Sequence, residues 1–339
     1  MSRGKVLVTG ASGYIAGYVV KALVADGWSV SGTIRSLAKG DAVRASLGLT
    51  ADELPLTAAD LTSDAGWAEA AGGCDFVQHI ASPLPTGAVK TDDDLIVPAR
   101  DGALRLLRAA KAAGVKRVVM TSSVAAMYYG MTGKDRTYTE ADWSDLSSPG
   151  TNAYAKSKTL AERAARDWVA AEGGGMEYCT INPALVLGPV LGNDFSGSLV
   201  VVTKLLNGEL PGLPAIGFGI CDVRDIAAAH VAAMTTPGIN GERFLCSGDY
   251  LGMADVAAIL KSRLADKAKR VPTMKLPNFL VRVSALFDEQ VKLVLPELGR
   301  TRVGDASHAR AVIGWNPRPV AETIVDTARS LIAAGLVKG

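Results

Sequence analysis

The chain has 339 residues, of which 48% are hydrophobic and 21% charged, and its formal net charge at neutral pH is +2. This composition suits one large globular domain or two, and the balanced charge gives no reason to expect a nucleic acid or an anionic membrane as partner. No apolar run reaches the roughly 18 residues of a membrane-spanning helix, and Met1 leads into a strand without an apolar signal segment, so we expect a cytoplasmic protein.

The first strand, turn and helix carry a possible nucleotide site. Val6–Val8 is an apolar run typical of a strand buried on both faces, and the turn Thr9–Gly17 follows it at once and opens a helix. Gly10, Gly13 and Ala16 have the spacing of a dinucleotide-binding turn. Gly10 would allow a sharp turn, Gly13 would let a pyrophosphate approach, and the helix N-terminus would offer free N–H groups to the anion. A glycine-rich turn without a ligand is the alternative.

The second strand, expected at Trp28–Ile34, ends beside Arg35. An NAD-binding protein usually has an Asp or Glu there, which accepts a hydrogen bond from the ribose 2′-hydroxyl. A guanidinium can instead bind a 2′-phosphate through two parallel hydrogen bonds, so Arg35 predicts a preference for NADP over NAD. Lys39 and Arg44 on the next helical segment could add positive charge, although a solvated helix face accounts for them equally well.

Two further strands are expected at Leu54–Ala58 and Asp75–His79. Asp60 follows the first of them, where an acid can simply cap a helix. Small residues follow the second, from Ile80 to Ser82, and would let a cofactor lie close to the strand end. We interpret His79 as a core residue and not as a catalyst.

The acidic run 91–94 is predicted to begin a helix, because carboxylates favour the positive end of a helix dipole. We expect this helix to continue to Ala113. A metal site there is the less favoured interpretation, and the four cysteines lack a short-range pairing pattern, so we expect neither a metal nor a disulfide framework. Lys116–Met120 is the fifth strand and ends in the hydroxyl residues Thr121–Ser123. Ligands of open parallel sheets lie beyond the carboxyl ends of the strands, which places a hydroxyl over the cofactor.

Tyr154 and Lys158 open a long amphipathic helix that we expect to reach Glu172. A spacing of four puts the phenol and the ammonium on one helix face. Such a spacing arises easily by chance, but this is the only Tyr-x-x-x-Lys in the chain, and it comes one crossover after the strand that ends at Ser123. A nearby cation lowers the pKa of a phenol, which makes it a better proton donor or acceptor at neutral pH.

These motifs resemble those of the extended short-chain dehydrogenases/reductases, and within them the dihydroflavonol-4-reductase group, which includes many bacterial and yeast carbonyl reductases. The resemblance covers nearly the whole chain, and its motifs are Thr9–Ile15, Asp60-Leu61, Thr121–Ser123, Tyr154–Lys158, Asn182–Pro189, Asp222–Asp225 and Gly314–Pro319. It implies an α/β fold, with a Rossmann-type doubly wound parallel sheet and a smaller C-terminal substrate lobe. We expect the dinucleotide-binding core at 1–186, with 222–247 returning to it, and the lobe and C-terminal helices mainly at 187–339.

The resemblance also implies roles for individual residues. Tyr154 would protonate a carbonyl oxygen, Ser123 would hydrogen-bond the same oxygen, and Lys158 would hold the nicotinamide ribose and lower the pKa of Tyr154. Asp60 would contact the adenine. The implied cofactor contacts are Gly10, Ser12, Gly13, Tyr14, Ile15, Arg35, Asp60, Leu61, Ile80, Ala81, Ser82, Tyr154, Lys158, Pro183 and Val186.

The substrate side is less defined. Plant flavonoid reductases carry an Asn five residues after the active Ser, where this chain has Tyr128, which argues against a flavonoid. Leu187–Cys221, rich in Gly and Pro, suits a lobe over the open end of the sheet. Candidate pocket residues are Met127, Tyr128 and Phe195, and further Tyr129, Met131 and Phe218. Packing in the lobe core explains each of them equally well, but together they favour an apolar or aromatic substrate.

We therefore expect NADPH-dependent reduction of a small-molecule aldehyde or ketone by a monomer or homodimer, with NADPH/NADP as cofactor. Two alternatives stay open. One is a nucleotide-sugar epimerase or dehydratase that uses a bound NAD(P) transiently, against which Arg35 and the apolar lobe argue. The other is a dinucleotide-sensing regulator without turnover, against which the retained Tyr154 and Lys158 argue.

Overall fold

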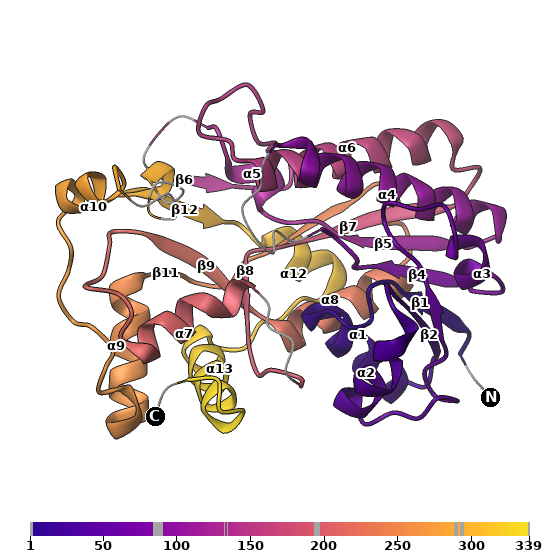
Figure 1. Ribbon diagram of the computed structural model, residues 1–339. Helices are drawn as coiled ribbons and strands as arrows, with labels where there is room; N and C mark the ends of the chain where they lie inside the picture. Colours follow the sequence, from indigo (N-terminus) through magenta and orange to yellow (C-terminus); the bar gives the residue numbers. More distant parts are fainter. Residues whose placement is uncertain are drawn as a thin grey trace.

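The computed structural model describes residues 3–83, 91–131, 133, 135–192, 197–287, 291 and 295–337. Its largest feature is a seven-stranded sheet with the order β10-β7-β5-β4-β1-β2-β3 (Figure 1). The strands are β1 (Lys5–Val8), β2 (Ser29–Ile34), β3 (Leu56–Ala58), β4 (Phe76–His79), β5 (Arg117–Thr121), β7 (Glu177–Pro183) and β10 (Arg243–Cys246). All neighbouring pairs are parallel, and the order runs outward from β1 and β4 in both directions. This confirms the doubly wound, Rossmann-type fold predicted from the sequence.

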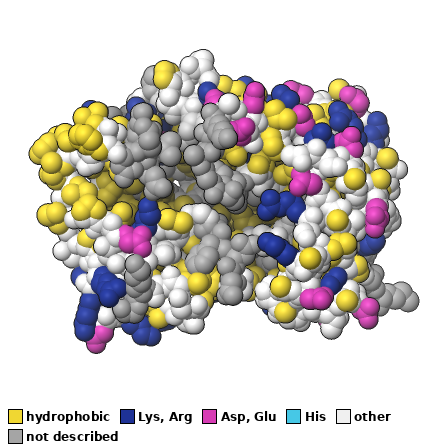
Figure 2. Space-filling view, in the orientation of Figure 1, with side chains coloured by type: hydrophobic (Ala, Val, Ile, Leu, Met, Phe, Trp, Pro, Cys, Tyr) yellow, Lys and Arg dark blue, Asp and Glu magenta, His cyan; other side chains and the backbone are white. Residues whose placement is uncertain are grey.

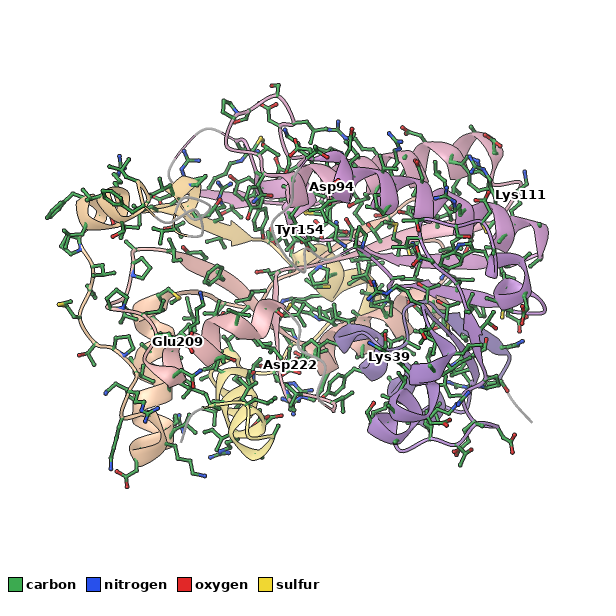
Figure 3. All side chains as sticks on the ribbon, viewed as in Figure 1. Lys39, Asp94, Lys111, Tyr154, Glu209 and Asp222 are labelled. Carbon is green, nitrogen blue, oxygen red and sulfur yellow. The ribbon has the colours of Figure 1, made fainter. Side chains whose placement is uncertain are left out.

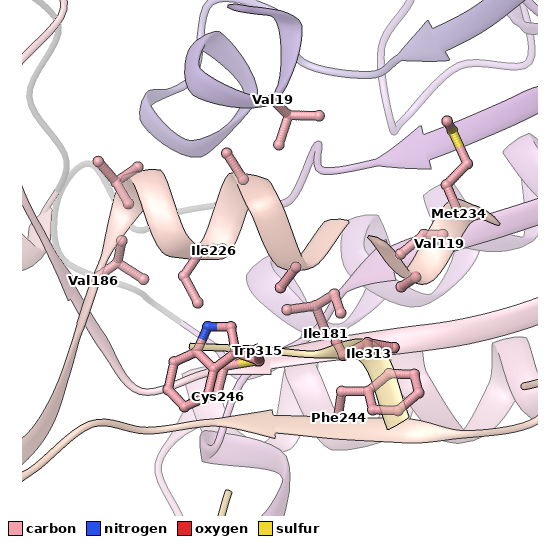
Figure 4. Close-up of a cluster of buried hydrophobic side chains, with 14 of the residues drawn as sticks. Val19, Val119, Ile181, Val186, Ile226, Met234, Phe244, Cys246, Ile313 and Trp315 are labelled. Atoms are coloured by element: carbon pink, nitrogen blue, oxygen red, sulfur yellow. The ribbon is translucent and has the colours of Figure 1, made fainter. Parts of the chain in front are cut away.

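Helices cover both faces of this sheet (Figure 1). One face carries α1 (Tyr14–Ala25), α2 (Gly40–Leu47), α8 (Val223–Thr235) and α12 (Ser307–Ile313), and the other carries α3 (Trp67–Ala71), α4 (Asp93–Ala112) and α6 (Ala153–Glu172). Successive strand residues point to opposite faces. Val6 and Val8 therefore belong to the hydrophobic cluster under α1 and α8, which we call the first cluster, and Leu7 belongs to the cluster under α4 and α6. Figure 4 shows the first cluster, in which Val19 of α1 and Ile226 of α8 lie over the sheet. Burial on both faces explains the continuous apolar runs of these strands.

A smaller part of the chain packs beside the main sheet (Figure 1). It contains a three-stranded sheet of β8 (Leu185–Leu187), β9 (Gly217–Asp222) and β11 (Tyr250–Gly252), with α7 (Val200–Asn207), α9 (Met253–Leu264) and α13 (Val320–Ala333). Its own hydrophobic cluster includes Leu199, Ile220, Leu260 and Ile324. The remaining elements are α5 (Ala125–Tyr128), α10 (Asn278–Ser284), the strands β6 (Asp135–Tyr138) and β12 (Thr301–Gly304), and 3-10 turns at Leu37–Lys39, Gly197–Leu199, Ala265–Ala268 and Leu295–Glu297.

The chain crosses between the two parts more than once. α8 packs on the main sheet, and β10 pairs with β7 at its edge. A second return was not predicted: Ala309, Ile313 and Trp315, near the C-terminus, pack in the first cluster of the main sheet. The strands β6 and β12 also pair in parallel with each other. The two parts are therefore held together by several crossings and not by a single linker.

The surface combines mixed charges with one apolar region. Hydrophobic side chains gather over α10 (Figure 2), where Phe279 is 64% exposed and Phe287, just after the helix, is 87% exposed. Large exposed apolar side chains are unusual on soluble surfaces and set α10 apart from the other described helices. None of the helices in the described ranges has both the length and the apolar sequence needed to cross a membrane.

The four cysteines are buried free thiols. They are Cys74, Cys179, Cys221 and Cys246. Burial raises the pKa of each thiol above its ordinary value, in Cys179 to about 12. At neutral pH all four are therefore protonated.

A group of ion pairs ties α8 to the C-terminal segment. Asp225 accepts hydrogen bonds from the backbone N–H of Arg318 at 2.8 Å and from its guanidinium at 2.7–3.1 Å. Asp222 caps α8 by accepting from the backbone N–H of Arg224, whose guanidinium bridges to Asp326 of α13 at 2.8 Å. The Asp225 side chain is only 10% exposed, whereas that of Asp326 is 35% exposed. The Asp225 pair is thus the more shielded of the two contacts.

We expect Asp225→Ala to lower the free energy of unfolding by about 2–4 kcal/mol, because several charge-assisted hydrogen bonds are lost in a shielded position. The matched variant Asp326→Ala loses one partly exposed ion pair and should cost less than about 1 kcal/mol. Urea unfolding followed by circular dichroism measures both. Equal losses for the two variants would contradict the importance of the Asp225 contact.

Candidate active site

The glycine turn brings the ends of β1 and β4 together. Gly10 has a φ of +67°, and a Cβ on it would lie 3.1 Å from the Cα and Cβ atoms of Ala81, so a side chain there would be strained and crowded. The Gly13 N–H donates to the Gly10 carbonyl at 2.8 Å, and Gly13 is the N-cap of α1. Ser12 and Gly13 are exposed. The first N–H groups of α1 therefore open onto an accessible turn that suits a phosphate group.

Thr9 fixes the segment after β4. Its Oγ1 accepts hydrogen bonds from the N–H groups of Ile80 and Ala81, each at 3.0 Å, and lies 2.9 Å from Nδ1 of His79. Because both acceptor positions of the hydroxyl are used, we infer that it donates its proton to Nδ1. Burial, followed by the charge of Lys158, lowers the pKa of His79 to about 3, so the ring is neutral. His79 is a core residue, as predicted.

The Tyr14 side chain takes a position away from the exposed turn. Its ring packs edge to face on Tyr18, with the centroids 5.9 Å apart, and its hydroxyl reaches the backbone of Gly188. Burial is the main cause that raises its pKa. Any contact of Tyr14 and Ile15 with an anion then falls to their backbone N–H groups in the first turn of α1.

Arg35 and Asp60 lie at the ends of neighbouring strands, β2 and β3. Arg35 is exposed, and Asp60 accepts hydrogen bonds from the hydroxyl and the N–H of Thr62. These bonds, followed by the charge of Arg35, lower the pKa of Asp60. Arg44 donates to the Leu54 carbonyl at 3.0 Å and pairs with its helix neighbour Asp41, which favours the helix-surface interpretation of that residue.

The next residue after Asp60 packs inward. Leu61 is half-buried, and a Cβ on Gly102 of α4 would come within 2.6 Å of its side chain. Ser82 is also half-buried and follows Ala81 beyond β4. Both residues thus lie at the carboxyl ends of β3 and β4, as the sequence predicted.

The structure brings the three predicted catalytic side chains together. Ser123 follows β5, and its hydroxyl lies close enough to that of Tyr154, at the start of α6, to lower the pKa of the phenol. Nζ of Lys158 lies 5.9 Å from the centroid of the Tyr154 ring and 3.5 Å from the carbonyl oxygen of Thr121. Figure 3 shows Tyr154 near the middle of the molecule, between the main sheet and the smaller part. Asn152 fixes this end of α6, since its Oδ1 accepts from the Ala155 N–H at 2.9 Å.

The electrostatics of the pair differ from the expectation. Burial raises the pKa of Tyr154, and the lowering contribution comes from the hydrogen bond with Ser123 and not from Lys158. Burial also lowers the pKa of Lys158, and the charge of Glu162 partly offsets this change, so that the resulting pKa is about 8. The expectation that Lys158 lowers the pKa of Tyr154 is therefore wrong for this structure, because desolvation dominates at both residues.

Residues after β7 and around α5 border this site. The Pro183 carbonyl accepts from the Val124 N–H at 3.0 Å, next to Ser123, and Val186 is 7% exposed within the first cluster. Met127 is fully buried and Tyr128 is 6% exposed, so both lie in the packed core at the edge of the site. Their contact with a substrate stays a prediction, and Phe195 lies outside the described residues.

The half-buried Tyr129 has the clearer position beside the catalytic phenol. Burial is the main cause that raises the pKa of its hydroxyl, Tyr154 is close enough to raise it further, and the nearby Asn152 side chain lowers it. The guanidinium of Arg302 lies 5.4 Å from the Tyr129 ring centroid and pairs with Glu297. The sequence placed Tyr129 among several aromatic candidates, but only the fold brings it next to Tyr154.

Several known proteins are similar to this chain in sequence. A model of the NAD dependent epimerase/dehydratase family matches residues 6–246. Cinnamoyl-CoA reductase 2 of Arabidopsis thaliana is 36% identical over 280 residues, which cover 80% of this chain and 79% of that protein. Anthocyanidin reductase of Vitis vinifera is 30% identical over 287 residues, which cover 80% of this chain and 82% of that protein.

A solved structure resembles nearly the whole chain. The yeast methylglyoxal/isovaleraldehyde reductase Gre2, in complex with NADPH, superposes with a TM-score of 0.83 and 26% identity, over 98% of this chain and 100% of that one. These matches confirm the resemblance to the extended short-chain dehydrogenases/reductases and to the reductases within them. The chain therefore belongs to the NAD dependent epimerase/dehydratase family.

Proposed function

We propose that the protein is an NADPH-dependent reductase that converts an aldehyde or ketone to the alcohol. The observation that carries this proposal is the proximity of the Ser123 and Tyr154 hydroxyls, with the Lys158 ammonium beside the phenol ring, at the carboxyl edge of the sheet. The relatives named as reductases and the NADPH complex of Gre2 support the same function. They favour a reductase over a nucleotide-sugar epimerase, because the reductase names of these relatives are more specific than the description of the whole family.

The turn after β1 fits the cofactor. Its Gly10 leaves no space for a Cβ beside Ala81, and the N–H groups at the start of α1 can bind the pyrophosphate. Arg35 would bind the 2′-phosphate, and Asp60 would contact the adenine end. Ile80, Ala81, Pro183 and Val186 would flank the nicotinamide end. When bound, NADPH supplies the hydride that reduces the carbonyl carbon.

The chain's own residues handle the proton. The Tyr154 phenol would donate its proton to the carbonyl oxygen, while the Ser123 hydroxyl hydrogen-bonds that oxygen as its negative charge develops. Because burial raises its pKa, Tyr154 is protonated at neutral pH, which is the state that a proton donor needs. Lys158 would hold the nicotinamide ribose through hydrogen bonds from its ammonium, which lies next to Tyr154.

The substrate we propose carries an apolar or aromatic group next to its carbonyl. Tyr129 lies beside Tyr154, and Met127 and Tyr128 line the same edge of the core. We also propose that 1–186 with 222–247 binds the cofactor, that 187–339 supplies most of the substrate lobe, and that the enzyme works in the cytoplasm as a monomer or homodimer.

NADPH consumption with aromatic aldehydes, bulky ketones, flavanonols and steroid ketones tests the substrate class. Failure of every carbonyl compound to consume NADPH would contradict the proposal.

We expect Tyr154→Phe to lower kcat/KM by about 10²- to 10⁴-fold, because the proton donor is removed while the ring stays in place. NADPH binding, followed by fluorescence titration, should be nearly unchanged. The matched variant Tyr178→Phe removes a buried hydroxyl that only contacts Sδ of Met120, at 3.2 Å, and should leave turnover intact. Wild-type turnover in Tyr154→Phe would refute the assignment of the proton donor.

We expect Arg35→Asp to weaken NADPH binding by about 10- to 100-fold, since a charge-assisted hydrogen bond to the 2′-phosphate is lost and a like charge is introduced. NADH binding should change little, because NADH lacks that phosphate. Lys39→Asp reverses a charge in the next exposed turn and serves as the control. If Arg35→Asp weakens both cofactors equally, or if Lys39→Asp alone discriminates between them, Arg35 does not recognise the phosphate.

A further inference from the structure

Glu162 is a fully buried acid in α6, one helical turn after Lys158. Its carboxylate accepts hydrogen bonds from Nε of Arg243, from the Ser122 hydroxyl and, at 2.8 Å, from Nδ2 of Asn182. These donors come from β10, from the end of β5 and from β7, so three strands of the main sheet meet at one side chain of α6. A carboxylate that accepts from several buried donors, one of them a guanidinium, is held firmly in one position.

A relay leads from Glu162 to the backbone of Ser123. Nδ2 of Asn182 donates to Glu162 and also lies 3.3 Å from the Ser123 carbonyl oxygen. The other end of this amide is fixed as well, because Oδ1 of Asn182 accepts from the Thr180 hydroxyl at 2.8 Å. The amide of Asn182 therefore has one orientation, which connects the carboxylate of α6 with the residue that contacts Tyr154.

Glu162 also contributes to the electrostatics around Lys158. The groups that face the ammonium are Tyr154 and Glu162 from its own helix, the Thr121 carbonyl from β5, and His79 from β4. Tyr154 and His79 are neutral near pH 7, so Glu162 is the anion among these groups. Arg243 pairs with Glu162 through Nε, while its guanidinium carbon lies 3.7 Å from the Trp143 ring centroid and Nη1 donates to the carbonyl oxygens of Glu140 and Asp142.

We propose that Glu162 is a positioning residue of the reductase site, which holds Ser123 in place through Asn182 and places a negative charge one helical turn from Lys158. This inference rests on the proposed function, in which Ser123 and Lys158 act on the carbonyl and the cofactor. Glu162 touches neither the substrate nor the cofactor, and it acts only through these two residues.

The sign of the pH effect follows from the charges. Burial lowers the pKa of Lys158 to about 8, and the negative charge of Glu162 opposes that change. Without this charge, and with Arg243 left unpaired, the pKa of Lys158 falls further and the ammonium is lost at a lower pH. Because the ammonium is the active form, the alkaline limb of the pH profile of kcat/KM should shift downward by about one pH unit.

Glu162→Gln removes the negative charge and leaves a single amide oxygen to accept from both Nε of Arg243 and Nδ2 of Asn182. We expect kcat to fall by about 10- to 100-fold, because Ser123 is displaced from Tyr154, and we expect the alkaline limb to shift downward. Asn182→Ala cuts the relay without changing a charge, so it should lower kcat and leave the limb in its wild-type position. Ser122→Ala removes one donor to Glu162 and should change neither quantity appreciably.

The measurements are steady-state pH profiles, NADPH fluorescence titrations and melting curves of the three variants and the wild type. A wild-type kcat and limb in folded Glu162→Gln would overturn the proposal, as would an Asn182→Ala variant no slower than Ser122→Ala. If Glu162→Gln does not fold, Glu162→Asp keeps the charge but shortens the side chain, and we expect a lower kcat with the limb unmoved. A wild-type kcat in Glu162→Asp or a shifted limb would then refute it. A loss of turnover in Tyr154→Phe without any effect of Glu162→Gln would leave the proposed function intact and refute only the role of Glu162.

Discussion

The close approach of the Ser123 and Tyr154 hydroxyls is the contact on which the site depends. It joins the end of β5 to the beginning of α6, and both ends are fixed independently. The Ser123 Oγ also accepts from the Ala125 N–H at 3.1 Å, and Asn152 caps α6 just before Tyr154. A parallel sheet with β5 near its centre places this contact at the carboxyl edge, close to the turn after β1. The chemistry we propose is therefore a consequence of the sheet order.

Desolvation determines what the paired groups can do. Burial raises the pKa of Tyr154 and lowers that of Lys158, so the phenol keeps its proton, while the charge of Glu162 opposes the loss of the ammonium. In water the four-residue spacing would merely place a cation near a phenol. Inside the fold, the loss of solvent is larger than this attraction, and neighbouring carboxylates and hydroxyls set the protonation states.

Much of the fold and the centre of the site could be predicted from the sequence. Strands buried on both faces leave continuous apolar runs such as Val6–Val8, and the glycine spacing and the pair Tyr154 and Lys158 are local patterns. The pairing of β6 with β12 was not predictable, because Asp135–Tyr138 is mostly exposed and its partner lies far along the chain. The contacts of Glu162 were missed for a similar reason, since its donors come from three separate strands. An acid on the buried face of an amphipathic helix was the signal that could have indicated it.

The burial of the four cysteines has a consequence for an enzyme that handles carbonyl compounds. Aldehydes are electrophiles, and in proteins the thiolate is the sulfur species that attacks them. Cys221 and Cys246 lie within the first cluster, close to the chain that borders the site, yet burial keeps both as inaccessible thiols. Reactive carbonyl substrates can therefore reach Tyr154 without forming covalent adducts on sulfur, and the enzyme is protected from the compounds that it reduces.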